Sequence, residues 1–328
     1  MRVFIFPAAV AFLVCVATLV WGGVDALVLM GLLAILETTL SFDNAIINAK
    51  VLARMDKRWQ TRFLTWGIPV AVFGTRFVLP ILIVSAAVGI APLAVATLAF
   101  FEPAVYTLHL QQAHVAIASF GSTFLFLVSL KYFLDERKKI HWIRLIEPRL
   151  AKWGGIDAIE VAVVLSALLT CAFLLPADRA TILLAGVVGV VLFILVQGIA
   201  QSFELETGAA VGSIALFVYL NVLDAAFSLD GVIGAFAITP SLPVIIAGLG
   251  IGALFVRSFT VYLVRAKTLE SLIYLEHGAH WAIFGLALAM LLGIFVHVPE
   301  ALTGLVGAVV IMFAYISSRR EIQRSAVN

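Results

Sequence analysis

The amino-acid sequence predicts an all-α, polytopic membrane protein built from about ten transmembrane helices. Hydrophobic residues make up 63% of the 328 residues and charged residues only 12%, whereas a soluble protein is about 25% charged. The mean hydropathy is +1.14, and apolar runs of about 20 residues, the length of a membrane-spanning helix, recur along the chain. No polar stretch is long enough to fold alone, so residues 1–328 are expected to form a single integral membrane domain.

The positions of the expected spans follow from the lengths of the apolar runs. The spans are placed near residues 3–21, 26–50, 63–87, 114–134, 158–175, 180–199, 208–238, 243–264, 279–297 and 300–317. The run after Met1-Arg2 is interpreted as a retained first helix rather than a cleaved signal sequence. Residues 88–113 include Pro92, Pro103 and several polar side chains, so this piece is expected to lie along the membrane surface.

Lysine and arginine are distributed asymmetrically between the expected connections, which indicates an orientation. Of the 21 basic residues, all except Arg76, Arg179 and Arg257 fall on one side of the membrane if both termini are cytoplasmic. Arg76 and Arg257 lie within spans three and eight, and Arg179 faces the opposite side. The sequence is therefore expected to encode a multi-pass protein of the inner (plasma) membrane with both termini in the cytoplasm.

Two acidic motifs with the same spacing lie inside expected spans. Glu37 precedes Asp43-Asn44 in span two, and Asp224 precedes Asp230 in span seven with the same separation. An ionisable group in hydrocarbon is costly unless it is partnered. A costly pattern that occurs twice predicts one site built from two halves.

The similarity between the two halves continues beyond the acids. Each acidic span is followed by a span with one arginine, Arg76 or Arg257, and then by a span that opens with Ala-His-x-Ala-Ile, at His114 or His280. Spans two and seven run in opposite directions, so this order predicts an inverted repeat of three plus three helices. The repeats are expected at residues 26–134 (spans two to four) and 208–297 (spans seven to nine). Many secondary transporters have this architecture, with a binding site near the membrane midplane.

The candidate ligands form an oxygen-rich set, and oxygen sites suit magnesium, calcium or manganese rather than zinc or copper. They are Glu37, Asp43, Asn44, Asp224 and Asp230. Residues six apart on an ideal helix are about 120° from facing each other. Either a local break rotates one acid of a motif, or each acid faces a different neighbour. Ser41 and Ser228 could bend their helices by bonding to the backbone, and Gly231 favours and Asn44 tolerates a break. Two other interpretations remain open, namely that the arginines pair with acids only to lock the fold, or that the acids relay protons without metal.

Supporting roles are expected for two arginines and two histidines. Arg76 and Arg257 would hold unloaded carboxylates charged. His114 and His280 lie at span ends, where an interfacial role is favoured and proton coupling is the alternative. His277 and His280 have a spacing that a helical metal pair could use, but a structural role is favoured there as well.

These motifs resemble the TerC family of integral membrane proteins, named for tellurium resistance. That family carries Glu-x5-Asp-Asn in one helix and Asp-x5-Asp in a later one, as this chain does at Glu37 and Asp224. Four longer stretches are similar to the branch long catalogued only as a domain of unknown function: Leu36–Asn48, Phe63–Arg76, Asn221–Thr239 and Tyr274–Ile283. Gly231 departs from many relatives, which carry Ser there. The resemblance implies metal export, because several members are implicated in manganese efflux and others in calcium handling or tellurite resistance.

The sequence is therefore expected to encode a secondary transporter, not an enzyme, that exports a divalent cation, Mn²⁺ first and Ca²⁺ second. The alternatives are a Ca²⁺/H⁺ exchanger and a non-transporting membrane scaffold linked to tellurite resistance or protein insertion. No Walker motif, nucleophile elbow or zinc-protease motif occurs, so ATP-driven transport and hydrolysis lack support. The expected partners are the lipid bilayer and the metal ion as substrate, with a homo-oligomer left open. No organic cofactor and no nucleic acid are expected.

Overall fold

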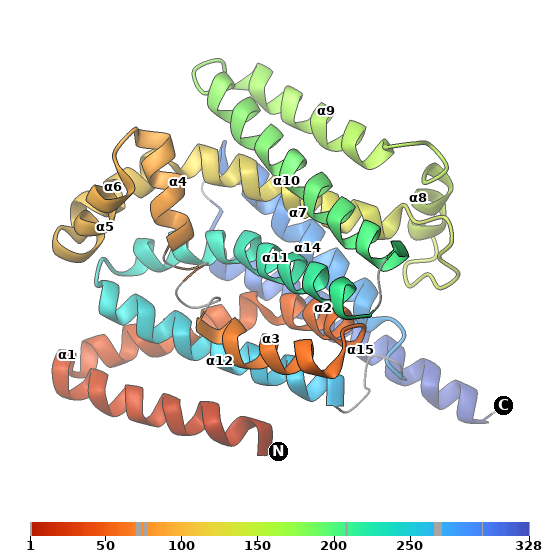
Figure 1. The fold of residues 1–328 in the computed structure, drawn as a ribbon, viewed down its shortest axis with the longest axis horizontal. Helices are drawn as coiled ribbons and strands as arrows, with labels where there is room; N and C mark the ends of the chain where they lie inside the picture. Colours follow the sequence, from red (N-terminus) through yellow and green to blue (C-terminus); the bar gives the residue numbers. More distant parts are fainter. Residues whose placement is uncertain are drawn as a thin grey trace.

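The computed structural model describes residues 2–69, 74, 76, 78–206, 209–265, 271–296 and 298–327, and this part of the chain is helical throughout apart from its connections (Figure 1). The helices are η1 (Arg2–Phe4), α1 (Ile5–Leu40), α2 (Phe42–Ala53), α3 (Lys57–Pro69), α4 (Leu79–Val88), α5 (Pro92–Phe101), α6 (Pro103–Gln112), α7 (His114–Phe133), α8 (Glu147–Trp153), α9 (Ile159–Leu174), α10 (Arg179–Glu206), α11 (Ala209–Ile238), α12 (Leu242–Arg265), α14 (Leu275–Gly293) and α15 (Glu300–Val327).

Seven helices of the described part are long and apolar enough to cross a membrane. These are α1, α7, α10, α11, α12, α14 and α15. The pair α4 and α5, bent by 115°, would be an eighth if it counted as one broken span. The helices therefore support a multi-pass membrane protein, although the count is lower than the ten spans expected from the sequence.

Part of the difference in count lies in α1, which contains two of the expected spans. Its 36 residues would measure about 54 Å as one straight helix, far more than the hydrocarbon core of about 30 Å. Gly23 interrupts it with φ 74° and ψ −167°, a conformation that glycine adopts readily. The helix folds back there into two adjacent arms (Figure 1), and Thr18 Oγ1 donates a hydrogen bond to Met30 Sδ at 3.3 Å between them. The first arm corresponds to expected span one, and the second arm together with α2 corresponds to expected span two.

The remaining difference comes from expected spans three and five. Helix α9 corresponds to span five but contains only 16 residues. Span three includes residues that lie outside the described part; its flanks are seen in α3 and α4, and residues 74, 76 and 78 are described between them. Residues 88–113 contain α5 and α6, which each begin with a proline in the first turn, where the missing N–H costs nothing. Their position along a membrane surface stays a prediction.

The second arm of α1 packs directly against α12, and glycine makes this approach close. A Cβ added at Gly252 would lie 2.5 Å from Cβ and Cγ of Glu37, and one at Gly248 would lie 2.6 Å from Cβ of Leu33. Small residues one helical turn apart let membrane helices approach backbone to backbone. The Gly-rich segment is therefore a packing surface, and it brings Glu37 into the centre of the bundle.

The connections rich in lysine and arginine meet at one end of the bundle, called here the basic end. Three contacts bring them together: the Lys50–Glu276 ion pair, the hydrogen bond from Tyr274 N–H to Ser318 Oγ, and the ring contact of Phe4 with Tyr262. The connection between α7 and α8 and the C-terminus lie toward this end (Figure 1). Arg179, at the start of α10, follows a connection at the opposite end.

We expect Gly252→Ala to lower the thermal unfolding temperature, because overpacking a close helix contact costs about 1–3 kcal/mol. Gly31→Ala on α1 is the matched control, since a Cβ there meets no described atom within 4 Å and alanine favours the helix by roughly 0.5–1 kcal/mol. Thermal unfolding of both purified variants in the same detergent tests this difference. Equal unfolding temperatures would contradict the close packing of α1 on α12.

Candidate functional site

The two acidic motifs meet around one buried arginine. Arg76 forms an ion pair with Glu37 on α1, which is 2% exposed, and its Nη1 lies 3.9 Å from Oδ2 of Asp224 on α11. Asn44 on α2 donates from Nδ2 to Oδ1 of Asp224 at 2.6 Å. Residues from both halves of the sequence therefore form one cluster, called here the Arg76 cluster: Glu37, Asn44, Arg76 and Asp224.

The helix that carries the first motif is interrupted between Glu37 and Asn44, and these two side chains reach different partners. Ser41 leaves helical geometry with φ −94° and ψ 14°, so α1 ends at Leu40 and α2 begins at Phe42. Its hydroxyl donates to Glu37 Oε1 at 2.8 Å rather than to a backbone carbonyl. The break considered from the six-residue spacing is present at Ser41.

The second motif helix does not break. Helix α11 runs without interruption from Ala209 to Ile238, so a break at Gly231 is not present. The glycine instead lies close to the first motif, because a Cβ added at Gly231 would be 3.3 Å from Glu37 Oε2. The end of the second motif thus faces the carboxylate of the first.

The remaining two acids are placed differently. Asp43 is buried in the first turn of α2, where its Oδ1 accepts the backbone N–H of Asn44 at 2.8 Å and the helix dipole favours a negative charge. The side chain of Asp230 lies outside the described part. Among the described residues, no three His, Cys, Asp or Glu side chains lie close enough to hold a metal ion. The four-carboxylate ligand set therefore stays a prediction.

Three buried side-chain oxygens at this site accept no hydrogen bond from the described residues. They are Asn44 Oδ1, Asn48 Oδ1 and Asp224 Oδ2. Buried acceptors in proteins are nearly always satisfied, so each such exception needs a physical explanation. Asn44 and Asn48 are one turn apart on α2 and thus share a face of that helix. A bound cation is one partner that oxygens without a hydrogen-bond donor can coordinate.

The second predicted arginine has a different neighbour. The guanidinium of Arg257 lies 4.3 Å from the ring centroid of Phe63, within the range of a cation–π contact, and its charge also acts on Asp224. The two histidines also differ. His114 opens α7 at the end opposite the basic end and lines a cavity, whereas His280 is buried near the basic end and stacks on Tyr132 with ring centroids 3.6 Å apart. Their role in proton coupling stays a prediction.

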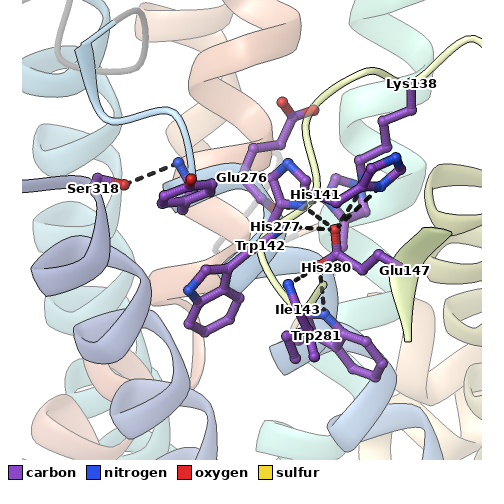
Figure 2. Close-up of polar contacts among 11 residues, drawn as sticks. Lys138, His141, Trp142, Ile143, Glu147, Glu276, His277, His280, Trp281 and Ser318 are labelled. Carbon is purple, nitrogen blue, oxygen red and sulfur yellow. Dashed lines mark hydrogen bonds and ion pairs between the residues drawn. The ribbon is translucent and has the colours of Figure 1, made fainter. Parts of the chain in front are cut away.

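Sequence reasoning missed Glu147, which is 1% exposed in the connection between α7 and α9. Its carboxylate accepts hydrogen bonds from Trp142 N–H at 2.9 Å, Trp281 Nε1 at 3.0 Å and His277 Nδ1 at 2.7 Å (Figure 2). Burial raises the pKa of Glu147, but the hydrogen bond and charge of His277 together with its other partners outweigh burial and lower the pKa to about 2. We call Glu147 and these three partners the Glu147 hub.

Two further groups of this connection surround the hub. Lys138 Nζ lies 3.8 Å from Glu147 Oε2 and 3.6 Å from the ring centroid of Tyr132, and burial lowers the pKa of Lys138 to about 8. His141 Nδ1 lies 3.9 Å from the same carboxylate oxygen. The Nδ1 atom of His277 bonds to Glu147 (Figure 2), whereas that of His280 bonds to the backbone carbonyl of Glu276, so a structural role for both fits better than a metal pair.

The fold and the Arg76 cluster define a class: a polytopic membrane protein with a buried ionic site in its helical bundle. The chain belongs to the family described as "Protein of unknown function (DUF475)", whose model matches residues 42–325. No curated protein and no solved structure matches the chain. The matched region includes Asp224, Arg76, Arg257 and Glu147, whereas Glu37 lies just before its start.

We expect Arg76→Gln to destabilise the protein by about 3–5 kcal/mol, because it leaves the carboxylate of Glu37 buried without its counter-charge. Adding Glu37→Gln should recover much of this loss, since two amides replace two charges. Arg179→Gln, at an exposed arginine, is the control and should change little. The measurement is thermal unfolding of the two single variants and the double variant. Additive losses would show that the pair is not coupled.

The pH dependence of stability should report on Glu147. Its pKa is lowered in the folded protein from 4.5 to about 2, so its stabilisation is complete above about pH 4.5 and is lost as the pH falls toward 2. This stabilisation is at most about 3 kcal/mol. Glu147→Gln should therefore unfold at a lower temperature than wild type at pH 6, with the gap closing toward pH 3. Glu160→Gln controls for loss of a carboxylate at the same end. A gap that is constant with pH would contradict an ionised Glu147.

Proposed function

We propose that this protein is a secondary transporter that exports a divalent cation, with Mn²⁺ as the preferred substrate. The observation that carries the proposal is the Arg76 cluster. It joins acids from both sequence motifs inside the bundle and leaves amide and carboxylate oxygens without hydrogen-bond donors. Oxygen ligands of this kind suit hard cations such as manganese and calcium.

The position of Arg76 fits the unloaded state of such a site. Its guanidinium lies between Glu37 and Asp224 and supplies the positive charge that a bound cation would otherwise supply. Four motif acids and two buried arginines leave a formal charge of about −2, which one divalent cation would balance. Mg²⁺ should be a poor substrate, because it dehydrates reluctantly and requires near-ideal octahedral geometry.

The helix contacts support the inverted repeat. A two-fold axis would place spans two to four on spans seven to nine. It would then map the contact between α2 and α14 onto the contact between α11 and α7, and both contacts occur. It likewise exchanges the contact of α1 with α12 for that of α11 with α3. Such a repeat would move as two units around a shared site.

The basic end supports an orientation with both termini in the cytoplasm of the inner (plasma) membrane, because lysine and arginine are retained on the cytoplasmic side. The resemblance to TerC proteins supports manganese over calcium as the substrate. One observation favours the second candidate, a membrane scaffold: Glu37 and Arg76 already pair, as a structural lock would.

Neutralising any of the four motif acids should lower Mn²⁺ flux roughly tenfold or more, the effect of losing about 1.4 kcal/mol of ion binding. The variants are Glu37→Gln, Asp43→Asn, Asp224→Asn and Asp230→Asn. Asp25→Asn, at the exposed turn between the arms of α1, is the control and should transport normally. Flux is measured in proteoliposomes, with folding checked by gel filtration. Wild-type flux in all four variants, or no flux in the wild type, would favour the scaffold.

A further inference from the structure

A cavity of about 390 Å³ lies at the end of the bundle opposite the basic end, among α6, α7, α11 and α14. Gln111 and Ala237 line it and are exposed, so it opens to the surface. Thr107 and His114 add polar groups to a lining that is otherwise mostly apolar. His114 thus borders an accessible space at this end of the protein.

The inner wall of this cavity is one side chain away from the Arg76 cluster. Phe236 on α11 lines the cavity and also lines a small void on its other side, together with Tyr106 and Arg76. The rings of Tyr106 and Phe236 are 5.0 Å apart. The side chain of Phe236, packed against Tyr106, therefore separates the cavity from the void that Arg76 lines.

The basic end is arranged differently at the position that corresponds to His114 in the sequence repeat. His280 is 7% exposed and stacks on Tyr132, while Lys138 Nζ lies against the same tyrosine. Next to it, the Glu147 hub fixes the first turn of α14 to the connection between α7 and α9. One histidine of the repeated pair thus borders open space, and the other is covered by packed side chains.

A contact next to the hub joins the two halves of the protein. Glu276, the neighbour of His277, pairs with Lys50 in the last turn of α2, the helix whose first turn carries Asp43 and Asn44. Moving α14 away from α2 would break the Lys50–Glu276 pair, and moving it away from the connection between α7 and α9 would break the hydrogen bond between His277 and Glu147. Both contacts must be released before this end of the bundle can open.

We propose that the Glu147 hub is the closed gate at the basic end and that the cavity is the vestibule through which the Arg76 cluster is reached in this conformation. Glu147 acts as a positioning residue, through His277 and Trp281 on α14. The identity of the ligand, a divalent cation, rests on the proposed function. The gate itself rests on the contacts above.

Cysteine accessibility tests the gate in a background that carries Cys15→Ala and Cys171→Ala. A cysteine at Ile233, in the cavity wall, should react with a membrane-impermeant, positively charged methanethiosulfonate. The reaction should occur only when the reagent is added on the side of the membrane opposite the basic end. A cysteine at Asn48, buried on α2, should be protected from both sides. Intact cells and inverted membrane vesicles present the two sides separately.

Adding Glu147→Gln should raise the reaction rate at position 48 from the basic side about tenfold and lower the rate at position 233. Glu160→Gln is the matched control, because its carboxylate pairs with Lys131 at the same end but joins α7 to α9 instead of α14. It should change neither rate. His277→Gln removes the same contact from the other partner and takes the place of Glu147→Gln if that variant does not elute as a folded protein.

Reciprocal changes at the two positions support a gate, because local loosening would raise the rate at position 48 without lowering the other. Unchanged rates, or rates that rise at both positions, would overturn the proposal. The labelling does not depend on ion flux. If the wild type transports no cation but the labelling changes are reciprocal, the proposed transport function is wrong and the gate stands. If the wild type transports the cation but Glu147→Gln leaves the labelling rates unchanged, only the gate is wrong.

Discussion

The pairing of a buried guanidinium with buried carboxylates is the constraint on which the rest of this structure depends. A charge inside an apolar bundle is tolerated only when an opposite charge or strong hydrogen bonds accompany it. Arg76 and Glu37 satisfy each other, and Asp224 lies close to the same guanidinium. Helices that are far apart in the sequence must therefore meet at one depth, which fixes how α1 and α11 lie relative to each other.

Backbone features make that meeting feasible. Gly248 and Gly252 let α12 approach α1 so closely that Glu37 is enclosed, and Gly231 leaves room beside its carboxylate. Ser41 satisfies one oxygen of Glu37 and also interrupts the helix, so Asn44 can reach Asp224 while Glu37 reaches Arg76. The polar chemistry of the cluster therefore depends on small residues that carry no charge themselves.

Local patterns predicted much of this arrangement, and tertiary contacts account for what they missed. Apolar length located most of the helices, and the 120° offset of Glu37 from Asp43 suggested the break found at Ser41. The same reasoning considered a break at Gly231, where packing against Glu37 instead accompanies a continuous helix. Glu147 could not be recognised, because its burial comes from His277 and Trp281, both over 100 residues away.

The difference between the two ends of the bundle follows from what the chain adds outside its repeated segments. The Ala-His-x-Ala-Ile sequence occurs in both halves, yet His114 borders a cavity and His280 is covered. His280 stacks on Tyr132 of α7, and the connection between α7 and α9 adds Lys138 against that tyrosine and Glu147 against the neighbouring His277. In the proposed transport cycle, two halves with similar sequences would open alternately at the two ends, and each single conformation would then be asymmetric. A connection that closes one end while the other stays open provides that asymmetry, and its hydrogen bonds give the closed end a defined geometry.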